Sequence, residues 1–255
     1  MEEPRGTALR VIDGGNEARW FCGFGDQHWG HPGCWQAGVK AAIEQIGERN
    51  ALWVGLGNYV NAGWAGIKKH GISKDVQEEP LVDEETEEFV ELIRPIASQC
   101  IGLVGGKCHE GWTEANDGFQ LVKHIVHDLD LPKDRWLGLN SRFVIKLGDQ
   151  RYRIHAWHGA GGAATQMGMF NSLLRMRNKS DSDIYLMGHI HQSLIYATYF
   201  AEARGNVERQ LKRLFVACGH FQAKSDYAEA KGLPPGKMGL VWLQLDADRW
   251  DTHPL

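Results

Sequence analysis

Short apolar runs alternate with segments of helical periodicity through the first part of the chain. Runs of this length, bounded by glycine and polar residues, are typical of buried strands. We predict such strands at residues 20–24, 51–56, 100–104 and 183–187. Apolar side chains at helical spacing predict helices at residues 33–49, 83–98, 116–129 and 163–177. This alternation indicates an α/β domain with helices packed outside one or two sheets.

The second half of the chain is predicted to be rich in strands. Residues 143–147 and 152–157 bracket Gly148-Asp149-Gln150 and predict a hairpin. Further strands are predicted at residues 193–200, 211–217 and 238–245. The first ~20 residues lack periodicity and predict a loose arm over residues 1–19. Because no repeat or linker interrupts the pattern, we expect one domain over residues 1–255.

Composition limits the class of protein. The chain has 255 residues, of which 43% are apolar and 24% charged, as in a globular domain with a full core. A net charge of −4 argues against a strongly electrostatic grip on nucleic acid, although a local basic patch stays open. The apolar runs are too short for a membrane span, and no secretory signal is visible. The five cysteines, irregularly spaced, favour a reducing compartment, so we expect a cytoplasmic protein.

Polar loops containing glycine follow four of the predicted strands. Open α/β sheets place ligand sites just beyond the carboxyl ends of their strands. The loops are Gly25-Asp26-Gln27-His28, Gly57-Asn58-Tyr59-Val60-Asn61, Gly105-Gly106-Lys107-Cys108-His109-Glu110 and Gly188-His189-Ile190-His191, and the hairpin adds His158-Gly159. Each fragment alone is more often an ordinary polar loop, but their joint order predicts one site. The mixture of carboxylate oxygen and imidazole nitrogen suits Zn, Mn or Fe better than Mg alone.

In this order the five loops resemble the motifs of the calcineurin-like metallophosphoesterase superfamily. Those motifs read D-x-H, G-D-x-x-D, G-N-H-E/D, H-G and G-H-x-H, and the resemblance spans residues 20–191. Residues 225–235 resemble the tails of phage-encoded members. The resemblance implies a four-layer αββα sandwich of two mixed sheets, with the metal site at the carboxyl ends of the strands.

The resemblance also implies two divalent metal ions, whether Mn, Zn, Fe or Mg. Carried over to this sequence, Asp26, His28 and His191 would hold one ion. The other would be held by His158 and His189.

Two positions depart from the family pattern. Asn58 stands where the family has the aspartate that bridges both metals. The metal-binding asparagine of the third motif is replaced by Cys108 if the alignment has no gap, or by Lys107 if one residue is inserted. His109 matches the histidine that contacts the phosphate and protonates the leaving group. Glu110 is expected either to support that histidine or to be a solvent-exposed loop acid.

The implied activity is hydrolysis of phosphate esters by a metal-activated hydroxide, with His109 and Asp26 as catalytic residues. The phage-like tail favours a nuclease or phosphodiesterase slightly over a phosphomonoesterase. The alternative is a pseudoenzyme or metal-impaired variant that binds a phosphate, a nucleotide or a protein, because Asn58 and Lys107-Cys108 weaken the ligand set. Neither reading requires a membrane partner.

Overall fold

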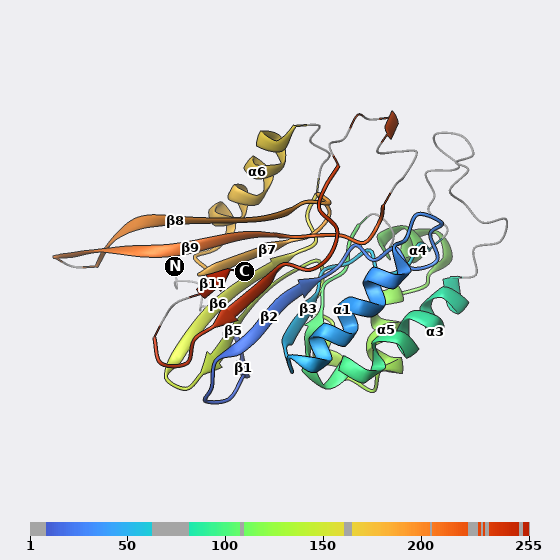
Figure 1. The fold of residues 1–255 in the computed structure, drawn as a ribbon, viewed down its shortest axis with the longest axis horizontal. Helices are drawn as coiled ribbons and strands as arrows, with labels where there is room; N and C mark the ends of the chain where they lie inside the picture. The colour runs from blue at the N-terminus through green and yellow to red at the C-terminus, as the bar shows by residue number, and fades with distance from the viewer. Residues whose placement is uncertain are drawn as a thin grey trace, which may run out of the picture.

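A computed structural model describes residues 9–62, 82–107, 110–160, 165–204, 206–223, 229–230, 232, 235–249 and 252–254. Within these residues the strands form two mixed sheets (Figure 1). The six-stranded sheet has the order β1-β5-β6-β7-β9-β8, and the five-stranded sheet has the order β11-β10-β2-β3-β4. The strands are β1 (Arg10–Asp13), β2 (Arg19–Phe24), β3 (Leu52–Gly55), β4 (Cys100–Leu103), β5 (Asn140–Leu147), β6 (Gln150–Trp157), β7 (Ile184–Met187), β8 (Ser193–Arg204), β9 (Val207–Cys218), β10 (Trp242–Leu245) and β11 (Thr252–Pro254).

Helices cover the outer face of each sheet. The α-helices are α1 (Gln36–Glu48), α3 (Val82–Ile93), α4 (Glu110–Asp117), α5 (Leu121–Asp128) and α6 (Gln166–Leu174). Three 3-10 segments, η1 (Arg94–Gln99), η2 (Lys133–Arg135) and η3 (Arg175–Lys179), complete the helical part of the described chain. Helices α1, α3 and α5 lie against the five-stranded sheet, whereas α6 lies against the six-stranded sheet (Figure 1).

Three apolar clusters fill the three spaces between these layers. One lies between α1, α3, α5 and the five-stranded sheet, a second between the two sheets, and a third beneath α6. Strand β2 shows the two-residue period, because Phe21 packs between the sheets whereas Cys22 and Phe24 pack against the helices. Burying one such phenylalanine contributes about 1.5–3 kcal/mol to stability. The predicted αββα sandwich of two mixed sheets is therefore confirmed.

Two predicted segments need correction. The helix expected from Asn116 to Leu129 is confirmed only over α5, because α4 ends at Asp117 and α5 begins at Leu121. Gly118, at φ +70°, ends α4 in the left-handed conformation that glycine adopts most readily. The loose arm expected over residues 1–19 is also wrong in part, since β1 pairs with β5 in parallel from Arg10 to Asp13. This edge strand is only four residues long and half exposed, so its periodicity was too short to recognise.

The topology brings the loops after β2, β3, β6 and β7 together. Strands β2 and β3 are parallel, and so are β6 and β7, so each pair ends on the same side of its sheet. Backbone hydrogen bonds then link the loops: Asp26 N–H donates to Gly57 O at 2.9 Å, and His28 N–H donates to Asn58 O at 3.0 Å. Among the described helices, none is both long and apolar enough to cross a membrane.

Candidate metal centre

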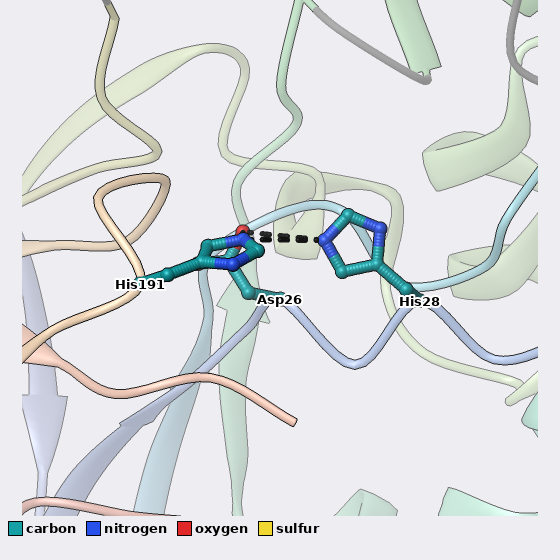
Figure 2. A group of neighbouring side chains, drawn as sticks. All are labelled: Asp26, His28 and His191. Carbon is teal, nitrogen blue, oxygen red and sulfur yellow. Dashed lines mark hydrogen bonds and ion pairs between the residues drawn. The ribbon is translucent and has the colours of Figure 1, made fainter. Parts of the chain in front are cut away.

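Asp26, His28 and His191 form a compact group of potential ligands (Figure 2). Asp26 and His28 follow β2, while His191 follows β7 in the other sheet. The Nε2 atom of His191 lies 3.5 Å from Asp26 Oδ1, and Nε2 of His28 lies 3.9 Å from the same oxygen. The two Nε2 atoms are 3.4 Å apart. One carboxylate oxygen and two imidazole nitrogens therefore point at a common volume, as predicted from the D-x-H and G-H-x-H motifs.

Asp26 is fully buried at the centre of the group. Its Oδ2 accepts the backbone N–H of His189 at 2.7 Å, and its Oδ1 accepts Nδ2–H of Asn58 at 3.1 Å. Burial by itself raises the pKa of the Asp26 carboxyl, but the hydrogen bond and charge of His191, followed by the charges of His158 and His28, outweigh it. The net pKa lies well below its usual value. Asp26 is thus an ionised carboxylate in a water-poor site, which attracts a cation.

His158 presents a lone pair into the same region. Its Nδ1 lies 2.6 Å from the carbonyl oxygen of Leu56, which can only accept, so Nδ1 carries the proton. In the neutral ring, Nε2 is then unprotonated. This Nε2 is buried and has no hydrogen-bond partner within the described part of the chain. A metal-binding histidine has this arrangement, in which a carbonyl fixes the tautomer from the opposite side of the ring.

The remaining predicted histidine, His189, faces His158. The centroids of the two rings are 5.0 Å apart, with an angle of 66° between the planes. His189 is also tied to the first group, because its backbone N–H donates to Asp26. The two predicted ligand sets, Asp26 with His28 and His191, and His158 with His189, are therefore neighbours around Asp26.

The backbone is unusual at these same positions. Eight non-glycine residues in the described ranges have positive φ, and five of them carry candidate ligands. These five are Asp26 (φ 53°), His28 (49°), Asn58 (53°), His189 (65°) and His191 (48°). A left-handed conformation at a residue with a side chain is strained, and such strain tends to persist where function requires it.

Two glycines are required by the close packing of these ligands. A Cβ at Gly188 would lie 2.8 Å from Asp26 Oδ2, and one at Gly57 would lie 2.8 Å from His158 Nδ1. Gly57 also has φ +85°. The glycines of the second and fifth motifs therefore make room for the carboxylate and the imidazole.

Asn58 is buried beside Asp26, as its alignment with the bridging position requires. Its Nδ2 donates to Asp26, whereas its Oδ1 has no hydrogen-bond partner among the described residues. An amide oxygen can bind a metal, but it is neutral where the family has a carboxylate. The side chain therefore offers one free oxygen and removes one negative charge.

The third motif is only partly visible. Cys108 and His109 lie outside the described residues, so the choice between Cys108 and Lys107 as the replacement stays open. Lys107 itself is exposed. Glu110 is buried, so its reading as a solvent-exposed loop acid is wrong. Its Oε1 accepts the backbone N–H of Asn58 at 2.5 Å and its Oε2 accepts that of Gly106 at 3.1 Å, which joins the second and third motif loops.

His220 lies at the site although the motifs did not indicate it. Its ring stacks on His191, with centroids 4.7 Å apart and planes 14° from parallel. Burial, with a smaller contribution from the charge of His191, lowers the pKa of His220 to about 4. The available signal was Gly219-His220 directly after the apolar strand β9, the same pattern that marked the other loops.

The described donors fit a divalent transition metal. They comprise an ionised carboxylate, imidazole nitrogens and one amide oxygen, a mixture that suits Zn, Mn or Fe. The buried Nε2 of His158 and the buried Oδ1 of Asn58 both lack a hydrogen-bond partner within the described ranges, and leaving such atoms unsatisfied costs about 1–3 kcal/mol each. A bound cation would satisfy both, so the residues present fit the group that the motifs imply.

No protein-family model matches the sequence, and no curated protein matches it. Comparison with solved structures finds a single mutant of Vps29 from Entamoeba histolytica, with 14% identity over 92% of this chain and 99% of that one and a TM-score of 0.46. Wild-type Vps29 from the same organism, solved with Zn²⁺, has 13% identity, coverage of 92% and 97%, and a TM-score of 0.41. A predicted phosphoesterase from Streptococcus pneumoniae has 13% identity, coverage of 93% and 89%, and a TM-score of 0.38. Sequence identities and TM-scores this low do not indicate a function. The function is therefore inferred from the side chains of the site itself.

Proposed function

We propose that this chain is a metal-dependent phosphoesterase of the calcineurin-like kind. The observation that carries the proposal is the buried Nε2 of His158, which has no hydrogen-bond partner among the described residues while Leu56 O holds Nδ1, together with the nearby ionised Asp26. A buried lone pair and a buried anion side by side are costly unless a cation lies between them. The order of the five motif loops along the chain supports the same function.

Each ion would have its own set of ligands. Asp26, His28 and His191 would hold one, and His158 and His189 would hold the other. When bound, two such ions neutralise phosphate charge and make water a nucleophile at neutral pH. The role of this chain's own residues is to hold those donors rigidly. Leu56 O fixes the His158 ring through Nδ1, and the backbone N–H of His189 fixes the Asp26 carboxylate.

His109 is proposed as the group that contacts the phosphate and gives a proton to the leaving oxygen. Glu110, the next residue, accepts two backbone N–H groups, from Asn58 and Gly106, which hold its carboxylate beside the second motif loop. We favour phosphodiesters, including nucleic acid, as substrates over phosphomonoesters because of the phage-like residues 225–235.

The test is hydrolysis of bis-p-nitrophenyl phosphate and p-nitrophenyl phosphate, each with Mn²⁺ and with EDTA. We expect turnover with Mn²⁺ that EDTA abolishes, and faster turnover of the diester. The absence of metal-dependent turnover on both compounds would contradict an active phosphoesterase.

A second candidate is a metal-impaired binding module, and the Asn58–Asp26 hydrogen bond favours it. With aspartate at position 58, two buried carboxylates would face each other and require a cation between them. The amide of Asn58 instead donates to Asp26, so this part of the site is satisfied without metal. Such a module would bind a phosphate or nucleotide without hydrolysing it.

Metal content separates the two candidates. The module predicts little metal retained after gel filtration, together with phosphate or nucleotide binding that EDTA leaves unchanged. Tightly held metal, with turnover, excludes it.

A further inference from the structure

A cavity of about 860 Å³ lies in the six-stranded sheet, far from the metal centre. It is bordered by residues near the beginnings of β6, β7 and β9, whereas the metal centre lies at the carboxyl ends of the strands. Asp183 and Gly188 stand at opposite ends of β7, about 17 Å apart at ~3.3 Å per residue. The cavity is therefore a separate site.

The cavity exists because β7 starts late relative to its neighbours. Strand β6 pairs with β7 only from Ile154, and β9 pairs with β7 only from Leu214. Residues 150–153 of β6 and 207–213 of β9 thus have no strand between them in the described structure. The β8–β9 hairpin extends well beyond β7 (Figure 1).

At the end of the cavity next to Asp183, the charges of two arginines are neutralised by two aspartates. Arg153 and Arg213 both bond to Asp183 Oδ1, at 2.7 and 2.9 Å, and both also bond to Asp181, at 2.7 and 3.0 Å. Arg213 is almost fully buried in this network. These four side chains form a rigid base for the cavity and leave little net charge there.

The open part of the cavity keeps a surplus of positive charge. Its lining adds two exposed arginines, Arg151 and Arg209, and one acid, Glu202. Tyr199, which also lines the cavity, is 63% exposed.

We propose that this cavity anchors a single strand of nucleic acid. Basic side chains that follow the phosphates, with an aromatic ring on which a base stacks, are the two elements of single-strand recognition. The proposal is compatible with a net charge of −4 because it requires only a local basic surface. It does not depend on the proposed hydrolase activity, since it uses none of the metal-centre residues.

Binding of a short fluorescein-labelled oligothymidine to the full chain, measured by anisotropy in EDTA at low salt, tests the proposal. We expect the double variant R151A/R209A to bind about tenfold more weakly, with a salt slope reduced by about 1.4. Tyr199→Ala should weaken binding about fivefold or more. These three side chains are exposed, so the variants should fold normally.

The matched control is K123A/K133A, which also removes two exposed positive charges but from the helical side of the molecule. It should bind like the unmodified chain. The absence of binding by the unmodified chain, or an equal loss in the control, would overturn the proposal. Displacement of the oligonucleotide by polyglutamate at equal charge concentration would also overturn it, because the site would then take acidic polypeptide.

Discussion

The Nδ1 atom of His158 lies 2.6 Å from the carbonyl oxygen of Leu56. This contact joins the loop after β6 in the six-stranded sheet to the loop after β3 in the five-stranded sheet. This bond fixes the orientation of the His158 ring and leaves a buried Nε2 without a hydrogen-bond partner among the described residues. Replacing His158 with Gln keeps most of the volume but removes the imidazole. We expect the affinity of the protein for metal to fall at least about 100-fold, with a parallel loss of phosphodiesterase activity.

The control for this variant is His124→Gln, since His124 lies half-exposed on α5. It should keep full metal content by elemental analysis. Unchanged metal binding in His158→Gln would show that His158 is a structural residue.

Asn58 gives a prediction in which stability and metal affinity change in opposite directions. Asn58→Asp restores the bridging carboxylate, so metal affinity should rise about tenfold or more. In EDTA the same change places two carboxylates together and removes the amide donor to Asp26, so the free energy of unfolding should fall by about 1–3 kcal/mol. Thermal unfolding with EDTA and with Mn²⁺ measures both. A variant that is equally stable in both conditions would contradict the bridging position of residue 58.

Gly188 allows the site to be disturbed without removing a ligand. In Gly188→Ala the new Cβ would meet Asp26 Oδ2 at 2.8 Å, and the carboxylate would have to move. We expect metal content and turnover to fall about tenfold or more, because small displacements at a reacting centre are costly. Gly47→Ala is the matched control, since Gly47 lies in α1 with Ile96 3.8 Å from the new Cβ. Equal activity in the two variants would argue that Asp26 has no fixed role.

Stability should fall in mildly acidic solution. Burial lowers the pKa of His155 to about 4, with help from Arg142 and Lys179, against about 6.5 in an unfolded chain. Between these values the unfolded chain takes up a proton that the folded chain does not, so stability falls as pH drops from about 6.5 toward 4. The urea midpoint should be lower at pH 5 than at pH 7, and His155→Gln should reduce the difference.

The apolar pattern was sufficient for an α/β domain because several of its strands are buried on both faces, whereas the two-sheet sandwich was implied by the resemblance of the loop motifs. Runs such as 51–56 and 184–187 are continuously apolar, and the helices between them have clear periodicity. The break at Gly118 was missed because one glycine within an apolar pattern is often tolerated. Strand β1 was missed because an exposed edge strand has little apolar signal.

The candidate site was predictable where ligands follow strands in fixed spacing, as for Asp26, His28 and His191. His220 was missed because a lone Gly-His pair has low specificity, and only the fold places it against His191. The hydrogen bond from Asn58 to Asp26 was also beyond the sequence, which records an amide but not the direction in which it points.

The central claim is that Asp26 and the surrounding histidines hold metal. Purified protein, loaded with Mn²⁺ or Zn²⁺ and passed through gel filtration, can be compared with Asp26→Asn by elemental mass spectrometry. We expect about two equivalents retained by the unmodified chain and about one by the variant, because Asp26 belongs to only one of the two proposed ligand sets. Equal metal content in the two proteins, or none in either, would contradict it.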